Sequence, residues 1–467
     1  MAKEKPQVLL ENILKIETKN KIMFSNLFLI VFFLIINYIF NNIFLLKVFS
    51  IFFILLISFL LYVRVGFLHP VAIIFGLFCF FNYNRIIFDI LGLMKFESGN
   101  FFDGNNSPLE SQILSLKIIN YSLIAWYIGV KKEVKRIYMV LKENKRLYGI
   151  SNFLFKLVIV FSLLFLFKEV KKILNDGYIN IYLSENSRNI FEKIILNSPF
   201  ILYCINLSTG YNKRTFFINT FFILCFISLD ILKGGRGLAL SYFLTVLTYY
   251  NYIIKNRTRI SIIKIGLLTF FLSLTSIVIG NFRSNLKLLN GEFFYNIVDF
   301  FTSQTITCSL LTKTIEYKEL LINKISIFVP WSKEVFYYNL LETKSFNTII
   351  SMTLNKEMFE KGFGLGGNPL AELYIFLKSE ILFFLIFYIY IYIILKYINY
   401  CNKNWFTFCV FLYFLPKLLL VPRGNFLFIN ILDIFKFILV IGIVVFLDFI
   451  IKLGEKNDKS KCNNTCL

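Results

Sequence analysis

Three arginines lie where an apolar run of the sequence meets a polar junction. Arg236 follows Gly234 and Gly235 in LKGGRGLAL. Arg283 lies in GNFRSN and Arg423 in LVPRGN. A guanidinium stays charged and its planar fork matches two phosphate oxygens, while glycines let a phosphate approach the main chain. Three such arginines at one membrane face could hold a diphosphate and stabilise its departure. The alternative is that each one extends to lipid head groups.

A carboxylate adds a second kind of chemistry. Glu372 lies in GGNPLAELYIF, at the predicted start of an apolar span, where a charge is costly. It could accept a proton from a sugar hydroxyl as a general base, or it could pair with one of the arginines. Both interpretations stay open. Arg188, in ENSRNIF, is a weaker basic candidate.

Other catalytic classes lack their residues. The single histidine, His69, is expected to be structural, because zinc hydrolysis and Ser-His-Asp catalysis normally need more. No DxD or ExD motif appears, so no divalent metal site is predicted. GFGLGG (362–367) has the letters of a dinucleotide-binding loop without the strand before it, and predicts a glycine-rich turn. We therefore expect neither a metal nor a cofactor.

The composition assigns the chain to the membrane. Apolar residues make up 57% of the 467 residues, charged residues make up 17%, and Phe alone contributes 58. A soluble chain of this size could not bury so much apolar surface, which excludes a cytosolic enzyme, a disulfide scaffold and a disordered protein. The net charge of +22 is then expected to orient the chain in the bilayer rather than to bind nucleic acid.

Apolar runs of about 20 residues predict the spanning helices. We expect an all-α polytopic membrane protein with about twelve transmembrane helices and no cleaved signal peptide. The predicted spans are 22–40, 43–63, 67–82, 113–130, 152–168, 192–210, 215–232, 237–254, 262–281, 372–395, 404–421 and 425–450.

Basic residues are divided unevenly between the two sides of these spans. With the N-terminus in the cytoplasm, the segments on that side hold half of the 50 Lys and Arg residues but a quarter of the 28 Asp and Glu residues. Such an excess marks the cytoplasmic side, so both termini are predicted to be cytoplasmic. The segments are 1–22, 64–66, 131–150, 211–214, 255–264, 396–403 and 452–467.

Three regions follow from this topology. Residues 1–281 form a membrane bundle of about nine spans, 282–371 form one large extracytoplasmic loop, and 372–467 form the last three spans with a cytoplasmic tail. A loop of that length is usually functional or a small domain. Its apolar stretches at 291–301 and 325–331 predict short helices lying on the bilayer surface.

Five short pieces carry a resemblance to a known family. They are KGGRG (233–237), NFR (281–283), FVPW (328–331) followed by Lys333, GGNPLAELY (366–374) and PRGNF (422–426). The sequence resembles the oligosaccharide repeat-unit polymerases, the Wzy-type O-antigen and capsule polymerases of bacterial inner membranes. Two pieces depart from that pattern. FLKSE (376–380) replaces the usual aromatic-Gly step, and the Pro-Trp piece lacks flanking basic and proline residues.

The resemblance implies a GT-C-like fold and a metal-independent glycosyltransferase. A glycan on undecaprenyl diphosphate would be the donor and a lipid-linked repeat unit the acceptor, at the outer face of the cytoplasmic membrane. A chain-length regulator and a flippase are the further partners implied. The predicted catalytic residues are Glu372, Arg236 and Arg423. The predicted diphosphate-binding residues are Arg236, Arg283, Arg423, Arg188, Gly234 and Gly235, and those of the substrate loop are Trp331, Lys333, Gly366, Gly367, Asn368 and Tyr374.

Other functions remain as alternatives. An O-antigen ligase shares the span pattern and the large loop, but ligases typically carry a loop histidine, which is missing here. A lipid-linked oligosaccharide flippase would have charges at mid-span and two related halves, whereas these charges lie at span ends and no internal repeat appears. A generic transporter or sensor is a further alternative.

Overall fold

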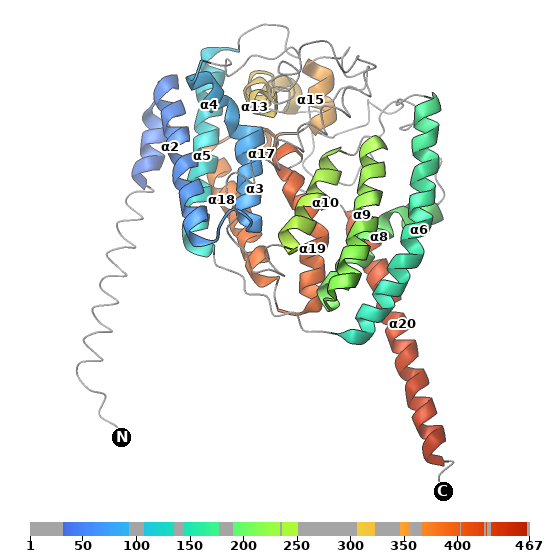
Figure 1. Ribbon diagram of the computed structural model, residues 1–467. Coiled ribbons are helices and arrows are strands. Elements are labelled where there is room, and N and C mark those ends of the chain that lie inside the picture. Colours follow the sequence, from blue (N-terminus) through green and yellow to red (C-terminus); the bar gives the residue numbers. More distant parts are fainter. Residues whose placement is uncertain are drawn as a thin grey trace, which may run out of the picture.

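The computed structural model is helical throughout the residues that it describes, and no strand occurs among them (Figure 1). The described residues are 31–92, 107–134, 144–176, 190–233, 236–250, 306–322, 346–354, 356, 367–401, 403–424, 426 and 431–464. This agrees with the predicted all-α, polytopic class.

The longer helices form a bundle, and the short helices α13 (Ile306–Glu316) and α15 (Phe346–Leu354) lie at one of its ends (Figure 1). The long helices are α2 (Ile43–Arg64), α5 (Leu109–Glu133), α6 (Lys145–Asp176), α8 (Ile190–Thr209), α9 (Lys213–Lys233), α10 (Arg236–Thr248), α18 (Glu380–Tyr400), α19 (Trp405–Leu420) and α20 (Ile431–Asn464). The shorter elements are α3 (Pro70–Phe78), the π turn η1 (Cys79–Tyr83), α4 (Asn84–Ile90), α13 (Ile306–Glu316), α14 (Lys318–Ile322), α15 (Phe346–Leu354), α17 (Pro369–Leu377) and the 3-10 turn η4 (Val421–Arg423).

Within the described residues, eight helices are long and apolar enough to cross a membrane. They match eight of the predicted spans and run over Ile43–Arg64, Pro70–Ile90, Leu109–Glu133, Lys145–Lys172, Lys213–Leu232, Glu380–Tyr400, Trp405–Arg423 and Asp433–Glu455.

The four other predicted spans do not coincide with a described helix that is long enough to cross a membrane. Span 262–281 lies outside the described residues, and spans 22–40 and 237–254 are described only in part. Span 192–210 corresponds to α8, whose apolar stretch, Ile194–Thr209, is shorter than a usual span. The total of about twelve therefore stays a prediction.

Short polar side chains determine where several helices begin. The Asn42 side chain accepts the Leu45 N–H at the start of α2, and the Asn404 side chain accepts the Thr407 N–H at the start of α19. These bonds satisfy main-chain donors that a helix cannot pair internally. The buried His69 accepts the Val71 N–H through Nδ1 at the start of α3, which is the structural role expected for it.

The centre of the bundle is built on α5, which packs against α2 and α18. Trp126 is fully buried on α5, and its ring meets the edges of Phe75 and Phe78 at centroid distances of 5.4 Å and 5.6 Å. Gly129 faces α18 so closely that a Cβ there would lie 2.9 Å from Leu395. Small residues at helix contacts allow this approach within membranes.

Segments predicted to be cytoplasmic meet at one end of the bundle. The Arg64 guanidinium donates to the carbonyls of Val130 and Lys131 at 2.9 Å and 2.6 Å. The Asn399 side chain donates to the Glu133 carbonyl at 2.7 Å. These bonds join the C-terminal ends of α2, α5 and α18.

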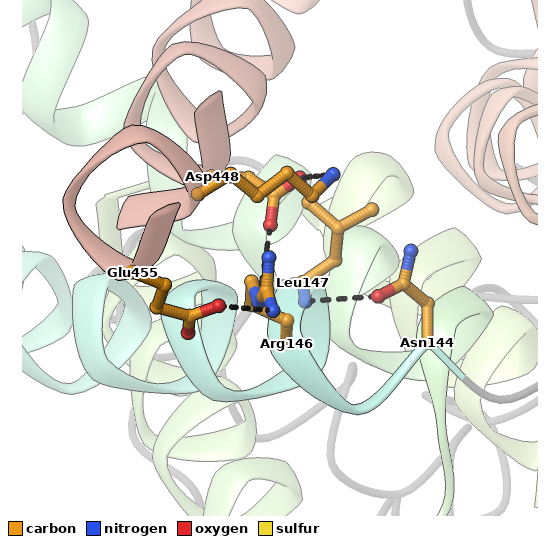
Figure 2. A network of polar contacts seen from close by, with 6 residues as sticks. Asn144, Arg146, Leu147, Asp448 and Glu455 are labelled. Atoms are coloured by element: carbon orange, nitrogen blue, oxygen red, sulfur yellow. Dashed lines mark hydrogen bonds and ion pairs between the residues drawn. The ribbon is translucent and has the colours of Figure 1, made fainter. Parts of the chain in front are cut away.

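The start of α6 is held at the same end by α8 and α20. The Asn144 N–H donates to the Thr209 carbonyl at 2.7 Å. Figure 2 shows Arg146 between Asp448 and Glu455 of α20, with N···O distances of 3.9 Å and 2.8 Å. The last turns of α20 project from this end, whereas α13 and α15 lie at the opposite end (Figure 1).

Candidate active site

Four short elements meet at the end of the bundle opposite to these basic segments. They are η1, α13, α17 and η4, each of which contacts at least two of the others. Two of them, α17 and η4, carry pieces that the sequence analysis selected. The other two come from the end of the third predicted span and from the region predicted to form the large loop.

The start of α17 is fixed by Asn368. Its Oδ1 accepts the N–H groups of Leu370 and Ala371 at 2.9 Å and 3.1 Å, and Pro369 occupies the first helical position, where no N–H is needed. Asn368 Nδ2 donates to the Thr307 carbonyl of α13 at 2.6 Å. One side chain therefore both starts the helix and anchors it to α13.

The residue before this cap joins two of the pieces that carry the resemblance. The Gly367 N–H donates to the Arg423 carbonyl at 2.9 Å. The glycine-rich piece and the late arginine piece are thus neighbours in space.

Glu372 lies on the first turn of α17 and is only 4% exposed. Its Oε2 accepts the Phe426 N–H at 2.6 Å, just beyond η4. Burial raises the pKa of this carboxyl from its ordinary 4.5 to about 7, although the Phe426 N–H opposes the rise. Within the described part of the chain, no arginine forms an ion pair with Glu372.

The span that follows Glu372 begins later than predicted. The predicted span was 372–395, but α17 ends at Leu377 and the membrane helix starts at Glu380. Lys378 adopts a left-handed conformation (φ 54°) and stops α17, and the Ser379 side chain caps α18. Glu372 therefore belongs to a separate short helix outside the candidate spans.

Arg423 lies half-buried at the end of η4. Its guanidinium carbon is 5.7 Å from the centre of the Phe81 ring, a distance at which a cation and an aromatic face attract. The Asn82 side chain donates to the Pro422 carbonyl at 2.7 Å. The segment of Arg423 is therefore contacted by two parts of the chain. Phe81 and Asn82 of η1 contact the Arg423 side chain and the Pro422 carbonyl, and the Gly367 N–H bonds to the Arg423 carbonyl.

Arg236 is the first residue of α10, whose start passes close to the end of α19. At Gly237, a Cβ would lie 3.3 Å from Leu420 Cδ2, just before η4. The main chain of Arg236 is thus near the segment that carries Arg423.

These elements offer two kinds of group to a substrate. They are a carboxyl whose pKa is raised to about 7 and a guanidinium. Among the described residues, no group of three or more His, Cys, Asp or Glu side chains could hold a metal ion.

Comparison with known families assigns the chain. A family model described as O-antigen polysaccharide polymerase Wzy matches residues 22–454, nearly the whole chain. The chain belongs to this family. Comparison with curated proteins gives no match, and neither does comparison with solved structures. The protein is thus a multi-pass membrane polymerase of the glycosyltransferase type, acting in polysaccharide biosynthesis on lipid-linked oligosaccharides.

Other predicted site residues of this Wzy family member are not all at this junction. Tyr374 is buried on a different face of α17 from Glu372, with Lys318 Nζ 5.3 Å from its ring centre, and burial raises its pKa. The side chain of Arg236 lies outside the described residues. So do seven other predicted site residues, which are Arg188, Gly234, Gly235, Arg283, Trp331, Lys333 and Gly366.

The region predicted to form the large loop contains a buried helix. Thr307, Ser309 and Thr314 of α13 are at most 1% exposed, and α13 packs against α5, α17 and η1. The stretches predicted to lie on the bilayer surface, 291–301 and 325–331, fall outside the described residues.

Sequence analysis missed the contribution of FFNYNR (80–85). Asn82 holds the Pro422 carbonyl, and the buried Arg85 donates to the Ser309 hydroxyl. Arg85 was detectable by the rule that selected the other arginines, because it lies at the outer end of a predicted span. Asn82 carried no such signal.

Proposed function

We propose that the protein joins undecaprenyl-diphosphate-linked repeat units into an O-antigen or capsule at the outer face of the bacterial cytoplasmic membrane. The observation that carries the proposal is the hydrogen bond from Gly367 to the Arg423 carbonyl. It brings a half-buried arginine and the helix of Glu372 together, at the end of the bundle away from the basic segments. That arrangement suits a transfer between two lipid-linked sugars at the outer membrane surface.

In the proposed reaction, an acceptor sugar hydroxyl attacks the anomeric carbon of the donor glycan. The new C–O bond forms as the bond from that carbon to the diphosphate oxygen breaks. The proton of the hydroxyl passes to a base, and the undecaprenyl diphosphate leaves with the bonding electrons. Arg423 and Arg236 would neutralise the charge that develops on the diphosphate, so no metal is required.

Glu372 is the residue that we assign as the base. Burial holds its pKa near the pH at which the enzyme would work, which is the optimum for general base catalysis. Its bond to the Phe426 N–H also braces the segment after Arg423. A general base must be ionised to act, whereas a carboxyl that only accepts the Phe426 N–H need not be. The pH dependence of the rate therefore separates the two roles of Glu372.

We further propose a GT-C-like bundle with both termini in the cytoplasm. The contacts of Arg64, Arg146 and Asn399 support this orientation, because they bring four of the segments predicted to be cytoplasmic to one end. A chain-length regulator and a flippase would be its partners in the membrane.

The deciding experiment compares the surface glycolipids of a deletion strain with those of its parent on a gel. We expect the ladder to collapse to a band carrying one repeat unit, because export and ligation continue without polymerisation. A strain in which no repeat unit reaches the surface would instead indicate a flippase or a ligase. The membrane face that holds the stalled lipid-linked glycan would then separate those two functions.

A further inference from the structure

A π turn interrupts the helical span Pro70–Ile90 close to the candidate site. It is η1, which has five residues, and Asn82 and Tyr83 within it are 1% and 0% exposed. A π turn adds one residue to a helical turn and therefore rotates the side chains that follow. Such turns often occur at functional sites. Here the turn directs a short amide side chain into the protein at the outer end of a span.

The side chain of Asn82 contacts the main chain of the arginine segment. Its Nδ2 donates to the Pro422 carbonyl at 2.7 Å, one peptide before Arg423. The ring of the preceding Phe81 faces the Arg423 guanidinium at 5.7 Å. Neighbouring residues of η1 thus hold both the main chain and the side chain of this segment.

The rest of η1 is fixed by the large loop. The Thr307 hydroxyl donates to the Phe81 carbonyl, and the Thr307 carbonyl accepts Asn368 Nδ2. Asn368 is followed by α17 and preceded by Gly367, whose N–H reaches the Arg423 carbonyl. These bonds close a ring from η1 through α13 and α17 to η4 and back to Asn82.

We propose that Asn82 is a positioning residue, which holds Arg423 in the orientation needed for the transfer reaction. This inference rests on the proposed function, in which Arg423 binds the diphosphate. A planar guanidinium gives a bidentate contact only when its plane and direction are set. Asn82 sets them from the neighbouring peptide, and it does not contact the substrate itself.

The chain offers a matched control two residues away. Asn84 has the same side chain and follows the same π turn, but within the part of the chain that the structure describes it makes no hydrogen bond to the segment of Arg423. Asn84→Ala is therefore expected to keep the parental rate. Asn82→Asp keeps the size of Asn82 but replaces the donating NH₂ group with a carboxylate oxygen, so the contact to Pro422 is lost without a cavity, although a negative charge is added. Asn82→Ala removes the same donor and adds no charge.

The test measures initial polymerisation rates of purified full-length variants in liposomes. The substrate is the lipid-linked repeat unit extracted from the deletion strain. We expect Asn82→Asp and Asn82→Ala to lower the rate by about 10–100-fold, since a misplacement of about 1 Å can cost that much. Asn82→Gln, which keeps an amide donor, is expected to recover part of the rate.

A double-mutant cycle separates positioning from stability. Arg423→Lys leaves a point charge with no bidentate geometry to preserve, so in that background we expect Asn82→Ala to cost less than about 3-fold. Losses that multiply in full would show that Asn82 supports the fold alone, and would overturn the inference. Parental rates in Asn82→Asp and Asn82→Ala would also overturn it. Because Arg423→Ala tests the diphosphate site separately, its full activity would reject the diphosphate-binding role of Arg423. Absence of polymerisation by the parental protein would instead reject the proposed function.

Discussion

The main-chain N–H of Gly367 donates a hydrogen bond to the main-chain carbonyl of Arg423, with an N···O distance of 2.9 Å. The two residues lie in different pieces of the sequence, one before the short helix α17 and one after the long helix α19. The bond determines how the helix that carries Glu372 sits against the arginine segment. It can be removed by a change that adds no charge.

Gly367→Pro removes this N–H, whereas Gly367→Ala keeps it. We expect the proline variant to lose the long glycan ladder, because the arginine segment is released from α17. The alanine variant is expected to keep most of the ladder. Gel analysis of surface glycolipids, with protein levels measured in the membrane fraction, checks both. A full ladder in Gly367→Pro would show that the bond is dispensable.

Arg423→Ala is expected to abolish long-chain glycan without loss of membrane insertion. Arg423→Lys keeps the charge but loses the forked donor, so we expect a partial loss, with shorter or fewer chains. The matched control is Arg214→Ala, an exposed arginine at the start of α9 in a predicted cytoplasmic segment. Chains of parental length in Arg423→Ala would contradict the diphosphate site.

Glu372→Gln separates the base from the brace. A glutamine oxygen can still accept the Phe426 N–H, but it cannot take a proton. If Glu372 is the base, the parental rate rises about tenfold per pH unit below its pKa of about 7 and levels off above it. Glu372→Gln would then be inactive at every pH. A variant with the parental rate and the same pH profile would leave Glu372 as a brace only.

The same carboxyl predicts how stability depends on pH. Its pKa is raised from 4.5 to about 7 in the folded protein, so between these values the folded state binds a proton that the unfolded state has released. This stabilisation is complete below pH 4.5 and is lost as the pH rises through 7, on the order of 3 kcal/mol. Thermal unfolding of Glu372→Gln in detergent should lack this contribution.

Gly237 tests the approach of α10 to α19. Leu420 Cδ2 would lie 3.3 Å from a Cβ at this position, so alanine needs a small shift and leucine needs the helices to separate. We expect Gly237→Leu to cost about 1–3 kcal/mol of stability and to reduce polymerisation strongly, while Gly237→Ala stays near the parent. Gly442→Leu is the control, because nothing lies within 4 Å of a Cβ there. Equal activity of the two leucine variants would contradict a close contact.

Orientation is tested by cysteine labelling near the C-terminus. Cys462 and Cys466 lie in the tail predicted to be cytoplasmic. A membrane-impermeant maleimide is expected to label them only after the cells are permeabilised. The variant with Cys462→Ser and Cys466→Ser gives the background from other cysteines. Labelling of intact cells above that background would place the tail outside.

Much of the fold was predictable because a spanning helix depends on the residues of one continuous segment. Eight predicted spans coincide with described helices, since an apolar run of the right length must satisfy its main-chain groups as a helix in lipid. The start of the span after Glu372 was predicted eight residues too early, at 372 instead of Glu380. Hydropathy cannot distinguish the short apolar helix α17 from the membrane helix that follows it.

By itself, the sequence determined that this is a helical membrane protein, and it selected Gly367, Asn368, Glu372 and Arg423 as candidates. Apolar runs, glycines and misplaced charges are local signals. Only the tertiary structure decided that Gly367 bonds to Arg423, that Glu372 is buried against Phe426 and that Asn82 holds Pro422. Those contacts join residues far apart in the chain, and they depend on how the helices pack, which no local pattern encodes.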